Sequence, residues 1–332
     1  MQKRRTMKEL EITVPSQLLD DIRTLINNAR IRVASTANIE TTLLYWNIGH
    51  RINTEVLGNK RADYGQQIVS RLATQLQNEY GSSYTSRNIH RMMQFAEQIS
   101  DFEIVSRLAT QLSWSHFMEI LPLKDDLQKE FYLTMAAYEG WTRDIMREKI
   151  DGMLFERTAI STKPEETIKA ELVKLKRDNI LSPDLVFKSP YFLDFTGLRG
   201  AYSEKSLEDV LINELEHFIL ELGSGFSFVE RQKRMIIDGE DFYLDMLFYH
   251  RKLHRLVAID LKLGRFKAAY KGQMELYLNW LNKYERQPSE ESPLGLILCA
   301  EGGSEQIELL ELDKSGIRVA QYYTELPDRN LL

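Results

Sequence analysis

The pattern of hydrophobic and polar positions divides the chain into a helical first half and a mixed second half. In residues 64–80, Ile68, Leu72 and Leu76 recur at every fourth position, which is typical of the apolar face of an amphipathic helix. Similar spacing continues through the first 155 residues and indicates a helical domain. The predicted helices begin at residue 17, cover 39–56 and 64–80, follow a turn at 81–84, surround 114–117 and cover 131–150.

From residue 204 onward, short apolar runs bounded by turns alternate with longer helical patterns. Asp238-Gly239 separates two such runs and predicts a β-hairpin. The element order α-β-β-β-α-β predicts a mixed sheet flanked by helices. The predicted elements are a helix at 206–222, strands at 226–237, 243–250 and 255–263, a helix at 266–284, a strand at 295–300 and a further strand at 317–323.

A change of texture near residue 160 predicts the domain boundary. The segment that follows contains Ser182-Pro-Asp and Ser189-Pro-Tyr, which interrupt regular structure. We therefore expect an α+β protein. Residues 1–160 form an all-α, helix-turn-helix-like domain, and residues 161–332 form an α/β domain preceded by a linker segment.

Two charges stand in the apolar strand Leu256-Val-Ala-Ile-Asp260-Leu-Lys262-Leu. They are two residues apart, so both side chains leave the same face of the strand. Each is costly to bury unless it is paired or bound to a metal. Asp245 stands on the preceding strand, and if the two strands are adjacent, two carboxylates and a lysine converge. That set suits phosphodiester hydrolysis with Mg²⁺ or Mn²⁺, which prefer oxygen ligands.

The spacing of the acid and the lysine is specific within this chain. Of its nineteen lysines, only Lys262 has an acid two residues before it. The alternative is a structural ion pair between Asp260 and Lys262, which leaves Asp245 unexplained.

The order Leu244-Asp245 followed by Asp260-Leu-Lys262 resembles the PD-(D/E)xK nuclease motif. Gln273 and Tyr277, four residues apart on the next helix, are similar to the Gln-xxx-Tyr element of many members. Residues 15–330 further resemble the bacterial YhcG-like family, in which a helical domain precedes a restriction-endonuclease-like PD-(D/E)xK domain. The stretches that carry this resemblance are Leu44-Tyr-Trp-Asn-Ile-Gly-His, Leu112-Ser-Trp-Ser-His-Phe, Leu181-Ser-Pro-Asp-Leu-Val-Phe, Phe228-Val-Glu-Arg-Gln, Gly272–Leu278 and Gly295-Leu-Ile-Leu-Cys-Ala.

The chain departs from the family pattern in three places. Leu244 replaces the proline of the motif, Asp260 replaces its usual glutamate, and Glu230 stands where the family has glycine. The literal Pro183-Asp184 pair has no acid-x-lysine close downstream and is interpreted as a turn.

The resemblance implies a further carboxylate from the first helix of the nuclease fold. Glu208 fits the family pattern, and Glu214 is its rival. The two are six residues apart, about 240° around a helix, so both do not point at one metal. We expect Glu208 to join Asp245 and Asp260 as a metal ligand, although either glutamate is also explained as a solvated helix acid.

Two groups of side chains are candidates for contacts with nucleic acid. The predicted helix after the Gly81 turn is interpreted as the DNA-recognition helix of a helix-turn-helix unit. An ordinary solvated helix face explains its polar residues almost as well. The second group follows the catalytic strand and suits phosphate. The candidates are Arg87, Arg91 and Gln94 in the first group, and Lys267 and Lys271 in the second.

Composition limits these expectations without overturning them. The net charge is −6, with 20 basic and 20 acidic side chains in residues 1–160, and 23 and 29 in residues 161–332. Nucleic-acid contacts must therefore come from local patches. The chain has a single cysteine, no apolar run of about 18 residues and no signal-peptide pattern, so we expect a cytoplasmic protein.

The sequence therefore predicts a Mg²⁺-dependent endodeoxyribonuclease that acts on double-stranded or branched DNA. A possible homodimer would serve to cut both strands. The alternative is a catalytically silent protein that uses the nuclease fold for DNA binding and assembly. RNA as substrate is also compatible with the motif.

Overall fold

The computed structural model describes residues 16–57, 62–301 and 304–325. By the proximity of their Cα atoms, the residues divide into two compact units, Met1–Leu123 and Lys124–Leu332. The domain boundary that the sequence suggests near residue 160 stays a prediction. None of the helices in the described ranges is long and apolar enough to cross a membrane.

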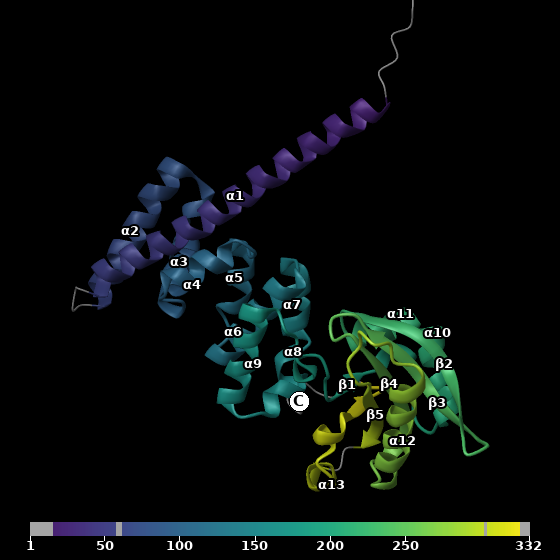
Figure 1. Ribbon diagram of the computed structural model, residues 1–332. Coiled ribbons are helices and arrows are strands. Elements are labelled where there is room, and N and C mark those ends of the chain that lie inside the picture. The colour runs from purple at the N-terminus through teal and green to yellow at the C-terminus, as the bar shows by residue number, and fades with distance from the viewer. Residues whose placement is uncertain (1–15, 58–61, 302–303, 326–332) are drawn as a thin grey trace, which may run out of the picture. The chain divides into compact units, whose positions relative to one another are not determined.

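The first unit is helical, as expected. Its first helix, α1, is one continuous element, so the two separate helices predicted there are wrong (Figure 1). No glycine or proline interrupts residues 16–48, and nothing in the backbone therefore forces a break. The helices are α1 (Ser16–Leu57), α2 (Ala62–Tyr80), α3 (Ser86–Gln98), α4 (Phe102–Ala109) and α5 (Trp114–Ile120).

The pair α2–α3 forms a helix, a turn and a helix, with the 3-10 turn Ser82–Tyr84 between them. Thr85 caps α3, since its side chain accepts a hydrogen bond from the Asn88 amide. Ile89 and Met92 of α3 are fully buried in the core of this unit. A turn therefore separates two helices here, as expected, while a helix-turn-helix motif and contact with DNA stay predictions.

The second unit begins with four helices and continues into a sheet with helices on both faces. The predicted helix over residues 131–150 is broken, because Gly140 adopts a left-handed conformation (φ 66°) and ends α6. The predicted helix over residues 206–222 is likewise split at Glu214. The helices are α6 (Asp126–Glu139), α7 (Arg143–Asp151), α8 (Leu154–Arg157), α9 (Glu165–Asp178), α10 (Glu204–Asn213), α11 (Leu215–Leu222), α12 (Ala269–Tyr284) and α13 (Ser304–Leu309).

The sheet is mixed and has the strand order β1-β6-β5-β4-β3-β2. Strands β2, β3 and β4 form an antiparallel meander, whereas β4, β5, β6 and β1 are parallel. The expected mixed sheet is confirmed, but the two-residue β1 was not predicted. The strands are β1 (Tyr191–Phe192), β2 (Phe226–Ile237), β3 (Glu240–His250), β4 (Arg255–Arg265), β5 (Leu294–Glu301) and β6 (Ile317–Tyr323).

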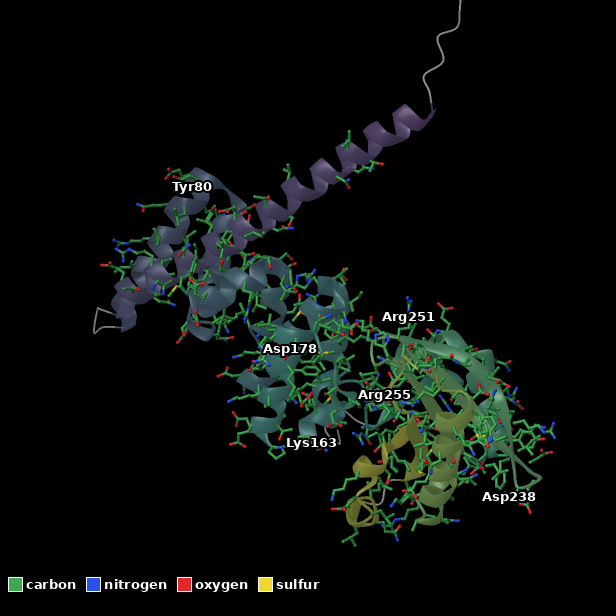
Figure 2. All side chains as sticks on the ribbon, in the orientation of Figure 1. Tyr80, Lys163, Asp178, Asp238, Arg251 and Arg255 are labelled. Carbon is green, nitrogen blue, oxygen red and sulfur yellow. The ribbon has the colours of Figure 1, made fainter. Side chains whose placement is uncertain are left out.

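The β2–β3 hairpin has the predicted two-residue turn, with Asp238 at its tip (Figure 2). Both turn residues have positive φ, 51° at Asp238 and 85° at Gly239, which is the geometry of a type I′ turn. This turn sets the register of β2 on β3 from Ile237 back to Glu230, and the register shifts between Glu230 and Phe228.

Helices cover the two faces of the sheet (Figure 1). Leu256 and Ala258 of β4 pack beneath Met274 and Tyr277 of α12. On the other face, the rings of Phe218 in α11 and Phe248 in β3 meet edge to face. Because side chains on a strand alternate, Asp260 and Lys262 continue the Leu256–Ala258 row toward the end of the strand.

Candidate active site

Asp245, Asp260 and Lys262 meet where β3 and β4 separate. The ladder between these strands ends at Met246↔Ile259, so the next residues, Asp245 and Asp260, face each other beyond the last pair. The Asp245 Oδ2 atom accepts a hydrogen bond of 2.7 Å from the Leu261 amide and so replaces a backbone acceptor. Lys262 Nζ lies 2.7 Å from Asp260 Oδ2. The strand-end geometry therefore brings the three predicted side chains together.

Burial shifts the pKa values of the acidic side chains in this cluster, in which two carboxylates face a single lysine. Asp260 is 3% exposed. Burial and the nearby Asp260 carboxylate raise the pKa of Asp245 to about 7, although the Leu261 amide opposes the shift. Burial also raises the pKa of Asp260, against the effect of Lys262. Burial alone would lower the pKa of Lys262, but the surrounding carboxylates outweigh it and raise that pKa. Two desolvated carboxylates thus share one lysine.

The donor set of this cluster fits a hard divalent cation. Asp245 and Asp260 offer carboxylate oxygens, and a nearby cation would offset the repulsion that raises their pKa values. No group of three or more histidine, cysteine or acidic side chains in the described part of the chain is arranged to hold a metal. Asp245 and Asp260 are the side chains of this cluster that would hold such a cation, and their role as ligands stays a prediction.

Glu208 is buried beside this pair, but it is held by strand β2. Its Oε1 accepts from Arg231 Nε at 2.6 Å, and its Oε2 accepts from Gln232 Nε2 at 2.8 Å. Gln232 also reaches Asp245 Oδ1 at 3.3 Å. The structure therefore links Glu208 to Asp245 through an amide rather than placing it directly against the pair. Its rival Glu214 ends α10 and bonds to His217 on the surface.

Two residues of this neighbourhood were missed from the sequence. Glu204 Oε1 accepts from the Leu263 amide at 3.0 Å, and its charge helps to raise the pKa of Asp260 and of Lys262. Gln232 is the second residue that the sequence analysis missed. Glu204 and Gln232 line a cavity of about 430 Å³ together with Lys205, Glu208, Arg231 and Asp245. The available signals were the four-residue spacing of Glu204 and Glu208 and the family stretch that ends at Gln232.

Gln273 and Tyr277 interact with each other as their helical spacing predicts. Gln273 Nε2 donates to the Tyr277 hydroxyl at 2.7 Å, and that hydroxyl donates to the Tyr243 carbonyl at 3.3 Å. Among the described residues, this chain of bonds ends on β3 rather than on Lys262. Besides Asp260, the Tyr270 ring lies near the lysine, with its centroid 5.3 Å from Lys262 Nζ.

The remaining predicted residues lie outside this cluster. Lys267 is exposed just before α12, and Lys271 pairs with Glu275 at 3.4 Å. Arg87 is exposed on α3, Arg91 is half-buried beside it, and Gln94 donates to the Leu121 carbonyl at 3.0 Å. Asp184 lies in the short helical turn Pro183–Leu185 and bonds to Arg318, so it takes no part in the cluster.

Comparison with known protein families agrees with this fold. A family model described as "DUF1016 N-terminal domain" matches residues 21–157, and one described as "YhcG PDDEXK nuclease domain" matches residues 184–331. The second domain is therefore a nuclease domain of the PD-(D/E)xK class. The chain is 30% identical over 347 residues to the Escherichia coli (strain K12) protein named "Putative nuclease YhcG", covering 95% of this chain and 92% of that protein. The chain belongs to the YhcG family, which confirms the resemblance.

Solved structures give a more distant likeness. The crystal structure of a repair endonuclease from Pyrococcus abyssi is 18% identical, with a TM-score of 0.28 over 40% of this chain and 50% of that one. An EndoMS–dsDNA complex is 18% identical, with a TM-score of 0.29 over 39% and 49%. The chain thus matches about half the length of each of these structures.

Proposed function

We propose that the chain is a divalent-metal-dependent endonuclease that hydrolyses phosphodiester bonds in DNA. Its active site in this proposal consists of Asp245, Asp260 and Lys262. The observation that carries the proposal is the meeting of two buried carboxylates with raised pKa values and one lysine at a strand end. Clusters of this kind, with strongly shifted pKa values, are concentrated at functional sites. Membership of a nuclease family supports the same chemistry.

In this proposal, Asp245 and Asp260 hold Mg²⁺ or Mn²⁺, the class of ion that nucleases with this domain generally use. When bound, the cation supplies positive charge for the phosphate oxygens and the attacking water. Lys262 keeps its proton on Nζ, where Asp260 orients it toward the phosphate to stabilise the charge that develops there. Glu208 supports the cation site from α10. Gln273 and Tyr277 steady the cluster by fixing β3 at the Tyr243 carbonyl.

DNA contacts are proposed on both units. Lys267 and Lys271 precede or begin α12, close in sequence to Lys262, and suit backbone phosphates. Arg87 and Arg91 of α3 suit the major groove or phosphates. Gln94 is the weakest of these candidates, because its amide already donates to the Leu121 carbonyl.

The test is a cleavage screen of the full chain on linear, branched and single-stranded DNA and on RNA, with Mg²⁺ and with chelator. We expect Mg²⁺-dependent cleavage of at least one DNA substrate. Lys262→Met should slow it by about 100- to 1000-fold, since a charge aimed at the transition state is lost. The matched control, Lys283→Met, removes a lysine from the last turn of α12 and should cleave like the wild type.

The possible results separate the candidate functions. Equal rates for Lys262→Met and the wild type would reject the proposed centre. Cleavage of RNA alone would keep the chemistry and change the substrate. A wild-type protein that binds DNA but cleaves nothing and binds no Mg²⁺ would favour the silent assembly role.

A further inference from the structure

Gln232 interrupts the ladder between β2 and β3 directly opposite Asp245. The pairing passes from Arg231↔Met246 to Lys233↔Leu244, so Gln232 and Asp245 are the skipped partners. Gln232 has a φ of 50°, in the left-handed region. For a residue with a Cβ, that conformation costs roughly 1–2 kcal/mol, and such strain is concentrated at functional positions.

The left-handed backbone explains how two successive β2 residues reach one carboxylate. In a regular strand, neighbouring side chains point to opposite faces. Here Arg231 donates to Glu208 Oε1 and Gln232 donates to Glu208 Oε2. Without the unusual conformation at Gln232, the strand could not direct both side chains to Glu208.

The Gln232 amide joins two carboxylates from different elements. Its Nε2 lies 2.8 Å from Glu208 Oε2 on α10 and 3.3 Å from Asp245 Oδ1 on β3. An ionised carboxylate only accepts hydrogen bonds, and an amide nitrogen has two hydrogens to donate. Both contacts therefore require the NH₂ group of Gln232, which donates one hydrogen to Glu208 and the other to Asp245.

We propose that Gln232 is a positioning residue for the cation site, and that Glu208 acts on Asp245 through it. The amide fixes the Asp245 carboxylate at Oδ1, while the Leu261 amide fixes it at Oδ2. On the other side, Gln232 donates to Glu208, which Arg231 in turn holds in place. This inference rests on the proposed function, because it assigns Gln232 to the same metal-holding carboxylates.

The test compares Mn²⁺ binding by calorimetry in the full-length wild type, Gln232→Asn and Gln232→Gly. Asparagine tolerates a left-handed backbone and keeps the NH₂ group, but it is one methylene too short to join both carboxylates. Glycine keeps the backbone conformation and removes the amide. Loss of a partner that orients a metal-ligating group weakens metal binding by about 10- to 100-fold. We expect that loss in both variants, with melting temperatures of the metal-free proteins close to the wild type.

A kinetic measurement adds a readout that a purely structural role would not change. The Mg²⁺ concentration for half-maximal cleavage should rise in both variants by the same factor as the Mn²⁺ dissociation constant. The maximal rate at saturating Mg²⁺ should fall much less. Arg234→Ala is the matched control on β2, since Arg234 pairs with Asp241 across the hairpin, and its metal affinity should equal that of the wild type.

The outcomes distinguish this inference from the proposed function. Wild-type metal affinity in folded Gln232→Asn and Gln232→Gly would overturn the role of Gln232 and leave the proposed function intact. Absence of Mn²⁺ binding in the wild type would overturn both.

Discussion

Asp245 shows how a single side chain can make the metal-free protein sensitive to pH. Its pKa is raised to about 7 in the folded protein by burial and by Asp260. Between the unfolded value near 4 and this value, the folded state binds more protons than the unfolded state. The stability that this group contributes is therefore complete at low pH and is lost as the pH rises through 7.

Asp245→Asn should remove this loss, because the amide does not ionise. In chelator, we expect the melting temperature of the variant relative to the wild type to rise between pH 5 and pH 8. A tenfold difference in proton affinity is worth about 1.4 kcal/mol, so the change should reach several degrees. Saturating Mg²⁺ should raise the wild-type melting temperature at pH 8 and leave the variant unchanged.

Asp241→Asn is the control for this prediction, because it removes a charge from the same strand at its exposed end. A wild type and Asp245→Asn that keep a constant difference in melting temperature from pH 5 to pH 8 would contradict the account.

At this scale, the sequence predicted the central residues but not their connections. Asp245, Asp260 and Lys262 stood out because charges in apolar strands need a reason. Gln232 did not stand out, since its importance depends on a left-handed φ that no local pattern predicts. Glu208 was predicted as a direct ligand, but the orientation of its carboxylate depends on Arg231 and Gln232 from a distant strand.

Among the elements, two glycines lie where another segment approaches closely. Gly49 of α1 lies against the backbone of α3, where an added Cβ would come within 1.9 Å of the Met92 carbonyl oxygen. Gly295 of β5 lies under α12, where an added Cβ would come within 2.6 Å of Met274 Cγ. A backbone carbonyl has little room to move, whereas a methionine side chain adapts readily.

Gly49→Ala should therefore destabilise the protein more than Gly295→Ala. We expect a loss of about 3 kcal/mol or more for Gly49→Ala, confined to the unfolding of the helical unit, and about 1 kcal/mol for Gly295→Ala. Denaturant unfolding followed by circular dichroism measures both. Equal losses, or a larger loss for Gly295→Ala, would show that the α1–α3 contact is looser than described.

Periodic elements were predictable, and breaks within them were less so. The strands β2 to β5 and the helix α12 follow from alternation and spacing in the sequence. The separation of α10 from α11 occurs at Glu214, which carries no breaking signal. The strand β1 was missed because its two residues are ordered by pairing with β6, more than a hundred positions later.

In the whole molecule, the chain combines a helical unit with a unit that contains the PD-(D/E)xK nuclease domain. The sheet meander of β2, β3 and β4 supplies Gln232, Asp245, Asp260 and Lys262 from three consecutive strands. The likeness to a relative of the YhcG family extends over 95% of the chain and so covers both units. We propose that the helical unit holds DNA. Cleavage measurements with Arg87 and Arg91 variants test this role once the wild-type activity has been measured.

We propose above that the Asp245–Asp260–Lys262 cluster, together with a bound cation, hydrolyses the phosphodiester bonds of nucleic acid. The most direct test is the single-turnover cleavage rate of Asp260→Asn with saturating Mg²⁺, measured beside the wild type and Asp241→Asn on the best DNA substrate. We expect a rate at least about 100-fold below the wild type for Asp260→Asn and an unchanged rate for Asp241→Asn, which lies on the exposed hairpin. A wild-type rate in correctly folded Asp260→Asn would contradict this proposal.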